Sequence, residues 1–339
     1  MAAGKFSVKV LVFEYITGGG FNRQQLPDAL AREGFLMLKA LLDNLTALHG
    51  IELLLMLDER FSRLTMTSHI NTVVIESHHH TLAEFERAAR QCDAVWPIAP
   101  EFDGILQALC RQVELLGKLL LTSPAAAVAI TGDKFKTYEH LASRNIATVS
   151  TRRFEHGVFA PGEWIVKPVD GVSCAGSHVI SSQDDFAALS AQLLDKARYI
   201  IQPHMQGEKT SLSCLFKQGK AWLLCVNLQR FSIVNNQYHL TECVVNHQPD
   251  FSLYLDLLAA IANAFPDLWG YAGIDLIEAA EQILVLEINP RLTTSFAGIE
   301  AALAVNVAGM VLQLLQGEPD IKPLRNQAIT INVMDAHEV

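Results

Sequence analysis

Apolar and polar positions alternate in two different ways along the first third of the chain. Short, mostly apolar runs occupy residues 8–13, 51–57, 72–75 and 94–98, as expected for buried strands, whereas apolar residues after Pro27 recur close to helical spacing. Strands that alternate with helices are typical of a parallel α/β sheet. We therefore predict an open α/β subdomain over residues 1–124, with its boundary near Ser123.

The pattern becomes mixed beyond Ser123. An alanine-rich segment at 124–130 is predicted to be a turn, and a charged helix at 133–144, two strands within 164–180 and a helix at 183–196 follow it. The remaining pattern predicts strands at 210–216, 221–228 and 238–245, a helix at 253–265 and a hairpin at 273–289. These elements indicate a central α+β subdomain at 125–202 and a C-terminal α+β subdomain at 203–339. The predicted fold class is therefore α/β, with α+β character in the C-terminal part.

Composition limits the classes of partner that the protein can have. Half of the 339 residues are apolar and 18% are charged, which fits a compact globular protein, and the formal net charge is -10. Without a long run of lysine or arginine, such a chain has no general attraction for nucleic acid. A bound polyphosphate would have to be neutralised locally by a few cationic side chains and a metal ion.

The sequence also predicts a location. The N-terminal run Met1–Val12 enters a strand directly, without the apolar segment and cleavage site of a signal peptide. The apolar stretch Ile299–Leu315 contains Glu300, Asn306 and Gln313 and is predicted to be one buried helix, so we expect no membrane span. The six cysteines show no CxxC spacing, which favours free thiols in a reducing cytoplasm.

Three oxygen-bearing side chains are predicted to meet on one face of the hairpin at 273–289. Side chains two apart in a strand share a face, so Glu287 and Asn289 point the same way, whereas Leu286 and Ile288 face a core. A three-residue loop at 280–282 would place Asp275 directly opposite Glu287. Oxygen ligands so close together suit Mg²⁺, which takes phosphate oxygens and waters as its other ligands. The alternative is a hairpin with an exposed polar face.

Cationic side chains near this hairpin and on an earlier strand could neutralise phosphate. Arg291 follows the hairpin, and its planar guanidinium could hold a transferring phosphate or an acyl phosphate, unless it forms a surface ion pair. Lys167 ends an apolar strand and is followed by a loop with Gly171, Ser173 and Gly176, whose backbone N–H groups could surround phosphate oxygens. The loop lacks the P-loop pattern, so a plain turn is the alternative.

Two further segments could take part in nucleotide binding. Lys134 lies at the start of a predicted helix with Asp133 or Thr131 as its cap, where a lysine is disfavoured unless an anion lies nearby. The irregular connection Gln202–Glu208 after an apolar strand could offer free backbone groups to an adenine edge. A plain crossover between strands is the alternative for this connection.

The loop after the first strand could meet a substrate. Glu14 ends the apolar run and could contact a substrate ammonium, while Gly18–Gly20 would allow close approach of the backbone. A tight turn is an equally good interpretation of the three glycines. They lack the full GxGxxG spacing of dinucleotide-binding proteins, which argues against an oxidoreductase.

These pieces, in this order, resemble the ATP-grasp superfamily over about residues 131–296. The resemblance implies an ATP-grasp fold in which two subdomains clasp ATP. Two lysines would contact its phosphates, a flexible glycine loop would cover them, and the backbone of a hinge would contact adenine. An acidic set would bind Mg²⁺, for which Mn²⁺ can substitute. The residues so implied are Lys134, Lys167, Gly171, Ser173 and Gly176 for the phosphates, Gln202, Pro203, His204, Met205 and Glu208 for the nucleoside, and Asp275, Glu287 and Asn289 for the metal. Two positions depart from the family pattern, because glutamate more often stands at Gln202 and an acidic ribose contact at Lys209.

A narrower resemblance concerns the substrates. The segments Val12–Gly20 and Glu287–Thr294 are similar to the tyramine:glutamate ligases of methanofuran biosynthesis and their relatives in one-carbon-metabolising bacteria. This similarity implies small-molecule carboxylate and amine substrates, with glutamate and tyramine or tyrosine as the pair to test. The substrate residues that it implies are Glu14, Gly18, Gly19, Gly20, Thr293 and Thr294.

The mechanism expected from this resemblance needs no protein nucleophile. Mg²⁺ and the lysines neutralise ATP, a substrate carboxylate attacks the γ-phosphorus, and an amine captures the acyl phosphate. Lys167 and Arg291 are expected to be catalytic through electrostatic stabilisation. A non-catalytic nucleotide sensor with the same fold is the alternative, and the oligomeric state stays open between a monomer and a homodimer.

Overall fold

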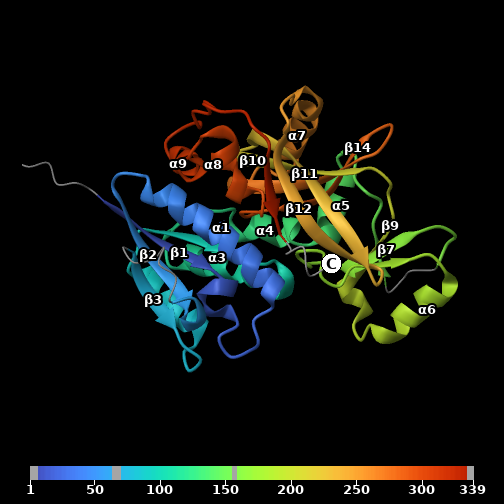
Figure 1. Cartoon of the computed structure of the whole chain (residues 1–339), viewed down its shortest axis with the longest axis horizontal. Helices are drawn as coiled ribbons and strands as arrows, with labels where there is room; N and C mark the ends of the chain where they lie inside the picture. Colours follow the sequence, from blue (N-terminus) through green and yellow to red (C-terminus); the bar gives the residue numbers. More distant parts are fainter. Residues whose placement is uncertain (1–6, 63–69, 155–158, 334–339) are drawn as a thin grey trace, which may run out of the picture.

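The computed structural model describes residues 7–62, 70–154 and 159–333, which form three β-sheets (Figure 1). Residues 1–6 of the predicted strand entry at Met1–Val12 lie outside this range. The strands are β1 Val8–Glu14, β2 Ile51–Asp58, β3 Asn71–Ile75, β4 Ala94–Ile98, β5 Leu119–Leu120, β6 Arg152–Arg153, β7 Trp164–Pro168, β8 His178–Ile180, β9 Tyr199–Pro203, β10 Glu208–Lys217, β11 Lys220–Val234, β12 Gln237–Gln248, β13 Gly270–Glu278, β14 Ile283–Asn289 and β15 Ile329–Asn332. The helices are α1 Asp28–Thr46, α2 Thr81–Arg90, α3 Ile105–Leu115, α4 Ala125–Thr131, α5 Lys134–Ala142, α6 Gln183–Gln192, α7 Ser252–Ala264, α8 Phe296–Leu303 and α9 Val307–Gln313.

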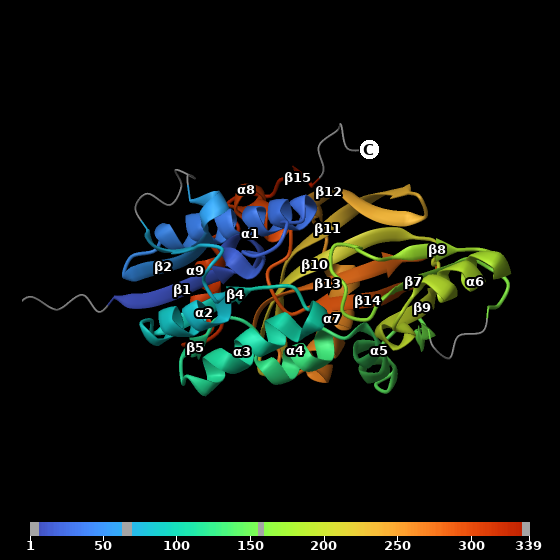
Figure 2. The same cartoon turned by 90° about the horizontal axis from the view of Figure 1, so that it is seen from below.

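The N-terminal sheet confirms the predicted parallel α/β layer. Its strand order is β3-β2-β1-β4-β5 and all of its pairs are parallel. Figure 2 shows α1 on one face of this sheet and α2 and α3 on the other. Because the chain builds outward from β1 in both directions, the carboxyl ends of β1 and β4 form a topological switch point, where such sheets usually bind ligands.

One helix of this region corrects a prediction. The alanine-rich segment 124–130 is not a turn, because helix α4 begins there with Pro124 as its N-cap. Alanine has the highest helix propensity, and the fixed φ of proline suits the start of a helix, so the local chemistry favours this outcome. Helices α4 and α5 lead out of the N-terminal sheet, and α5 packs against β14 and α7.

The C-terminal sheet is antiparallel, with strand order β14-β13-β10-β11-β12-β15. Helices α8 and α9 follow β14 and pack back against α1, so the C-terminal part also covers the N-terminal subdomain.

The apolar stretch 299–315 is not one helix as predicted, because Ala304 is left-handed (φ 53°) and Asn306 caps a new helix. Among the described residues no single helix is both long and apolar enough to cross a membrane, and α8 and α9 pass that test only together, with a 99° bend between them.

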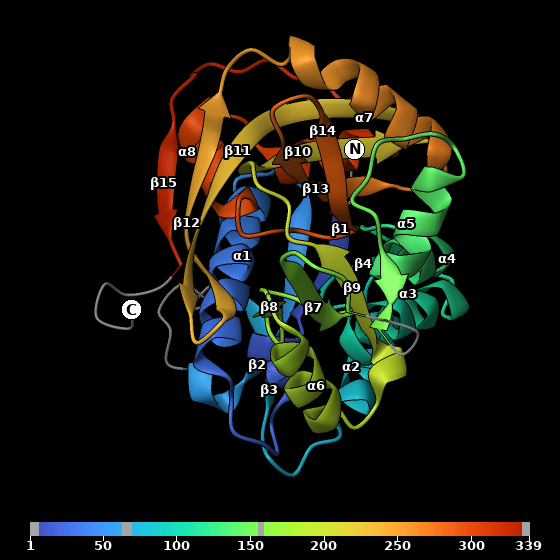
Figure 3. The ribbon, with the colours of Figure 1, turned by 90° about the vertical axis from the view of Figure 1, so that its right-hand side faces the viewer.

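The third sheet is small and lies beside the other two (Figure 3). It has the order β6-β9-β7-β8 and packs against α6 through Val166, Ile180, Leu189 and Ile201. Helix α6 begins with a capping box at Ser182 but ends at Gln192 rather than at residue 196 as predicted. A separate 3₁₀ turn, Lys196–Arg198, then leads into β9. We call this unit, residues 152–203, the lid sheet.

The hairpin formed by β13 and β14 has the predicted register for a different reason. Asp275 lies opposite Glu287, although the loop between the strands has four residues, Ala279 to Gln282. A β-bulge at Leu286 adds one residue to β14 and shifts the ladder back into the predicted register. The bulge also turns Leu286 away from the predicted core position, into a cavity described below.

Candidate active site

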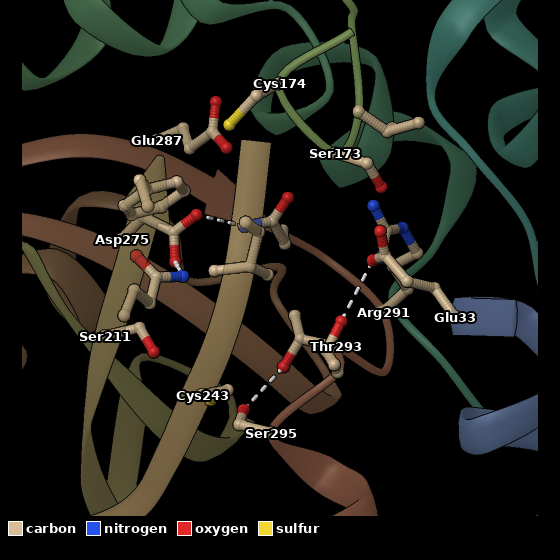
Figure 4. Close-up of a pocket in the computed structure, with 16 residues that line it drawn as sticks. Glu33, Ser173, Cys174, Ser211, Cys243, Asp275, Glu287, Arg291, Thr293 and Ser295 are labelled. Carbon is tan, nitrogen blue, oxygen red and sulfur yellow. Dashed lines mark hydrogen bonds between the residues drawn. The ribbon is translucent and has the colours of Figure 1, made fainter. Parts of the chain in front are cut away.

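The predicted oxygen ligands meet in one cavity between the C-terminal sheet, the glycine loop and α1. The cavity contains about 650 Å³ of space, and Asp275, Glu287 and Asn289 all line it (Figure 4). Asn289 Nδ2 donates to Asp275 Oδ2 at 3.2 Å, so its amide oxygen stays available as an acceptor. Gln229 on β11 donates to the other oxygen of Asp275 at 3.1 Å and fixes this carboxylate from the opposite side.

The two carboxylates have opposite electrostatic surroundings. Burial and the facing Glu287 raise the pKa of Asp275 above its usual range. Burial also opposes the charge of Glu287, but Lys134 and Lys167 outweigh it and hold the pKa of Glu287 below its usual range. Glu287 is therefore the charged member of the pair, and Asp275 would gain most from a cation beside it.

Two buried lysines adjoin this pair. Lys134 Nζ lies 3.1 Å from Glu287 Oε2 and donates to the carbonyl of Gly171 at 2.6 Å. The Asp133 carboxylate caps α5, as one of the two predicted caps, and places Lys134 in the first turn of that helix. Lys167 on β7 is only 8% exposed, and burial together with the neighbouring Lys134 lowers its pKa. Two ammonium groups so close together are favourable only with anions around them, as a polyphosphate would supply.

The glycine loop between β7 and β8 lies over the cavity. Its residues Ser173 (φ 52°) and Cys174 (φ 59°) are both left-handed, which is uncommon for side chains other than glycine. Ser173 and Cys174 line the cavity, while Gly171 accepts the hydrogen bond from Lys134 and Gly176 (φ 71°) closes the turn. The loop therefore places Ser173 and Cys174 over the face formed by Asp275, Glu287 and Asn289, which we call the metal face. The hydrogen bond from Lys134 ties the base of the loop to α5.

A second, mostly apolar cavity of about 580 Å³ adjoins the first one. Its walls come from the lid sheet, the segment after β9 and the C-terminal sheet. Cys174, Gln229 and Phe231 line both cavities, and Lys167 lines only this one. Other lining residues are Val149, Ile165, Tyr238, Leu276, Ile277 and Leu286. A flat apolar slot that opens toward cationic side chains suits a nucleotide base with its phosphates outside.

Some of the predicted hinge residues line this second cavity, and others do not. Gln202, Pro203 and Met205 line the cavity, and the carbonyl of Met205 accepts a hydrogen bond from Lys209 Nζ at 2.8 Å. His204 instead lies between Glu163 and Tyr238, with 2.5 Å from Nε2 to the tyrosine hydroxyl. Glu208 is exposed and pairs with Glu278 in the ladder of β10 and β13, away from the lining residues. Lys209, which stands where the family commonly has an acidic ribose contact, lines the cavity, whereas Glu208 does not.

Arg291 lies at the far end of the first cavity. Its Nη2 donates to Glu101 Oε2 at 2.9 Å and its Nη1 to the carbonyl of Leu292, while its Nε is buried without a hydrogen-bond partner. Burial opposes the charge, but Glu101 raises the pKa of Arg291. Glu101 follows β4, and a charged residue just after a parallel strand could have been recognised in the sequence as a residue of the sheet edge.

The predicted substrate loop is closely packed inside the N-terminal subdomain. Glu14 is buried and accepts hydrogen bonds from Ile16 N (3.2 Å) and from the backbone and hydroxyl of Thr17 (2.7 and 2.6 Å). Gly18–Gly20 form a π-helical turn in which an added Cβ at Gly19 would meet Ile75 at 2.4 Å. None of the three glycines lines the cavities described here, which agrees with the alternative of a tight turn.

Thr293 and Thr294 line the first cavity and lead to a carboxylate that the sequence did not reveal. Thr294 Oγ1 donates to Glu33 Oε2 at 3.0 Å, and Thr293 shares hydrogen bonds with Tyr271 and Ser295. Glu33 comes from α1, more than 250 residues away in sequence, so only its place beside the buried face of that helix could have indicated it. Figure 4 shows Glu33 next to Arg291, across the cavity from Asp275 and Glu287.

The donor set fits a hard divalent cation that keeps other oxygen ligands. It consists of two carboxylates and one amide oxygen, a combination that Mg²⁺ accepts when phosphate oxygens complete the shell. No group of three or more His, Cys, Asp or Glu side chains suited to a metal occurs in the described part of the chain. The protein alone therefore offers an incomplete shell, as expected for a metal that arrives with a nucleotide.

Comparisons with known proteins agree with this geometry. Residues 131–295 match the model of the ATP-grasp domain, and residues 51–128 match the model of the pre-ATP-grasp 3 domain. A tyramine–L-glutamate ligase of Methanocaldococcus fervens is 24% identical over 95% of this chain and 99% of its own length. The match to the ATP-grasp domain model therefore covers both lysines, the glycine loop, the hinge and the metal face.

Solved structures have the same fold. A putative ATP-grasp superfamily protein from Archaeoglobus fulgidus superimposes with a TM-score of 0.71 and 23% identity, covering 96% of this chain and 92% of that protein. The biotin carboxylase domain of the 2-oxoglutarate carboxylase from Hydrogenobacter thermophilus, solved with MgADP, has a TM-score of 0.70 and 13% identity over 93% of this chain and 71% of its own. Because the two family models together match most of the chain, it belongs to the ATP-grasp enzymes with a pre-ATP-grasp subdomain, and it resembles tyramine–L-glutamate ligases.

Proposed function

We propose that this enzyme is an ADP-forming ligase that joins a carboxylate to an amine through an acyl phosphate. The observation that carries the proposal is that Lys167 lines the apolar cavity while Glu287, in contact with Lys134, lines the adjoining polar one. A nucleotide base in the apolar cavity would direct its γ-phosphate toward the polar cavity. A carboxylate held there would be in line with that phosphate.

Each side chain of the junction has a distinct electrostatic task. Lys134 and Lys167 would bind phosphate oxygens, and the buried environment strengthens these contacts. Asp275, Glu287 and Asn289 would hold Mg²⁺, which neutralises charge on the phosphates when it is bound. Arg291, oriented by Glu101, would stabilise the negative charge that develops as the acyl phosphate forms.

The other parts of the site exclude water and position the reactants. The glycine loop covers the metal face, so the acyl phosphate would be shielded from hydrolysis until an amine reaches it. Phe231, Tyr238 and Leu286 would pack on the adenine ring, and Met205 would read its edge through the backbone. No protein nucleophile is required, because the substrate carboxylate itself attacks the γ-phosphorus.

For the substrates we propose glutamate as the acid and tyramine, tyrosine or a related amine as the acceptor, within the biosynthesis of a methanofuran-type one-carbon cofactor. The similarity to a tyramine–L-glutamate ligase across nearly the full length of both chains supports this choice. We also propose a cytoplasmic location, which the six free cysteines support, and we keep a homodimer as a form to be tested.

The test is a screen of ADP release with amino acids as donors and amines as acceptors, including glutamate with tyramine or tyrosine. Hydroxylamine in place of the amine traps an acyl phosphate as a hydroxamate, so it reports the first half-reaction alone. We expect ATP-dependent hydroxamate from the correct acid and an amide when the amine is added. ADP release without either product would overturn the proposed ligation.

Glu287→Ala and Glu281→Ala form a matched pair for this screen. Glu287 lies on the metal face, whereas Glu281 is an exposed glutamate of the loop in the same hairpin. The first change should abolish hydroxamate formation, and the second should leave it within about twofold of the wild type. Equal ADP release from Glu287→Ala and the wild type would contradict the assigned metal site.

A further inference from the structure

A narrow side cavity opens from the active site into the N-terminal subdomain. It spans about 350 Å³ when the solvent at its mouth is included, and it shares Glu33, Val172, Ser173 and Arg291 with the larger cavity. Its position is the switch point of the parallel sheet, because Glu14 ends β1 and Ile98 ends β4. A ligand in this side cavity would therefore reach the reaction centre at Glu33 and Arg291.

The inner wall of the side cavity is apolar. It is formed by Ile16, Leu30, Met37, Ile98, Ala99, Pro100 and Val172. Such a wall binds the uncharged body of a ligand through the hydrophobic effect and gives nothing to a second charged group. The polar end lies at Glu33, at the mouth toward the metal face.

The two carboxylates of the side cavity differ in their availability. Glu14 already accepts three hydrogen bonds from the turn after β1, and an added Cβ at Gly34 would meet its Oε2 at 2.6 Å, so it is enclosed by its own subdomain. Glu33 accepts hydrogen bonds from the side chains of Thr294 and Ser173, both at the mouth of the side cavity, and it lines both cavities. Glu33 is therefore the carboxylate that a ligand in the side cavity would meet.

The charge balance of the side cavity favours a cationic ligand. Among its described lining residues Arg291 is the single cation, and its guanidinium already pairs with Glu101. Burial raises the pKa of both Glu14 and Glu33 by more than their hydrogen bonds and the nearby Arg291 lower it. An ammonium would restore the balance, whereas a ligand carboxylate would meet acidic and apolar side chains.

We propose that Glu33 binds the ammonium of the acceptor and that the side cavity selects primary amines with an apolar body and no α-carboxylate. The inference rests on the proposed ligation and goes beyond it by separating tyramine from tyrosine as acceptor. In the second half-reaction Glu33 takes one proton from the ammonium, and the freed nitrogen lone pair attacks the acyl carbon. The bond from that carbon to the phosphate oxygen breaks, and inorganic phosphate leaves with the second proton as the amide forms.

The experiment compares Glu33→Gln with the wild type in two independent measurements. Calorimetric titration of tyramine into the full-length protein with ADP and Mg²⁺ measures acceptor binding without turnover. Loss of one partner of a buried charge pair should weaken this binding at least ~30-fold. Hydroxamate formation from glutamate, ATP and hydroxylamine, a small neutral acceptor, should fall at least ~10-fold less than amide formation with tyramine, because hydroxylamine brings no ammonium to Glu33.

The acceptor series gives the second prediction of the inference. The wild type should use tyramine and phenethylamine at least ~10-fold better than tyrosine, measured as kcat/KM for amide formation, because only tyrosine carries a carboxylate into the acidic wall. Raising the pH should partly restore amide formation by Glu33→Gln, since more of the amine is then uncharged in solution. A flat pH response of the variant would contradict the proton transfer to Glu33.

Controls separate failure of this inference from failure of the ligation itself. Asp43→Asn removes an exposed carboxylate from the same helix and should change neither measurement. Glu33→Asp keeps the negative charge and should retain part of the tyramine binding, so it tests the role of the carboxylate even if Glu33→Gln folds poorly. Tyramine binding unchanged by Glu33→Gln, or equal use of tyrosine, would overturn the role of Glu33. Absence of hydroxamate and amide in the wild type would instead overturn the ligation, and the titration would still decide whether Glu33 binds the amine.

Discussion

Asp275 and Glu287 lie directly opposite each other on β13 and β14, so two buried carboxylates share one face of the hairpin. Lys134 contacts Glu287, whereas Asp275 receives amide N–H groups from Gln229 and Asn289 and shares a hydrogen bond with Glu287. The pair is thus compensated on one side only. Such an arrangement costs stability in the ligand-free protein and gives a strong site for a cation.

Replacing Asp275 by asparagine should therefore separate stability from activity. Asp275→Asn keeps the shape and removes the cost of holding a buried carboxyl uncharged at neutral pH, so the ligand-free protein should gain roughly 1–2 kcal/mol, or about 2–4 °C in melting temperature. ADP formation should fall at least ~100-fold, because the cation loses a charged ligand. Thermal melts without ligands and an ADP-release assay measure the two effects.

The metal dependence of the melting temperature checks the same argument. Mg²⁺ together with ADP should raise the melting temperature of the wild type and do so much less for Asp275→Asn, since only a ligand that binds the folded state stabilises it. Ser232→Ala on β11 serves as a control outside the lining of both active-site cavities. Equal stabilisation of the wild type and Asp275→Asn would show that Asp275 does not bind the cation.

A second prediction concerns the bulged residue of β14. Leu286 is half-buried in the wall of the apolar cavity proposed to hold the adenine base, so Leu286→Ala would remove apolar contact with the base without opening the core. Loss of about 1–1.5 kcal/mol of contact should raise the KM for ATP about 5- to 10-fold at nearly constant kcat. Leu324→Ala, at an exposed leucine, is the matched control, and an equal KM in both variants would exclude Leu286 from the base site.

The metal face was predictable because its information is local. Asp275, Glu287 and Asn289 belong to one hairpin, and alternation along strands fixes which side chains share a face. The loop length was wrong, yet the bulge at Leu286 restored the register, because a slip by one residue would exchange the buried and polar faces of β14. The local pattern therefore predicted which side chains share a face, whereas packing against the core determined the bulge that keeps them together.

The acceptor side was harder to predict because distant segments build it. Glu33, Glu101 and Arg291 come from a helix, a strand end and the segment after the last long hairpin, and no pattern in one of them indicates the others. Glu14 was the natural candidate in the sequence, but its own turn takes up its oxygens. Gly18–Gly20 show the same limit, since close packing inside the subdomain requires glycine as much as ligand binding would.

A third prediction follows from the raised pKa of Glu33. A carboxyl whose pKa is higher in the folded than in the unfolded protein gives its full stabilisation below about pH 4.5, and this is lost as pH rises through the folded pKa. Arg291 is the charged group that lowers the shift, and burial is the larger effect. The melting temperature of Glu33→Gln relative to the wild type should therefore rise between pH 4.5 and 7.5.

Thermal melts of the ligand-free proteins at several pH values measure this difference. Asp43→Asn, which removes an exposed carboxylate from α1, shows how much the loss of any negative charge changes the melting temperature. A difference between Glu33→Gln and the wild type that stays constant, or that shrinks as pH rises, would contradict the burial of a charged Glu33.

A cluster of polar contacts at the base of the glycine loop joins the lid sheet to the N-terminal subdomain. Arg198 Nη2 donates to Asp103 Oδ1 at 2.6 Å, and the backbone N–H of Asp103 donates to Asp170 Oδ2 at 2.9 Å. Asp103 follows β4, whereas Asp170 and Arg198 flank β7 and β9. These contacts therefore hold the glycine loop against the subdomain that carries the side cavity.

Arg198→Ala should loosen this closure with little effect on folding. Arg198 and Asp103 are about half exposed, so the pair contributes little to stability and the melting temperature should change by less than ~2 °C. An open lid admits water to the acyl phosphate, so the ratio of ADP released to amide formed should rise at least ~2-fold. High salt should move the wild type toward the same ratio, because it screens an exposed ion pair. Lys196→Ala, in the same turn, should keep the wild-type ratio, and an unchanged ratio in Arg198→Ala would show that other contacts close the lid.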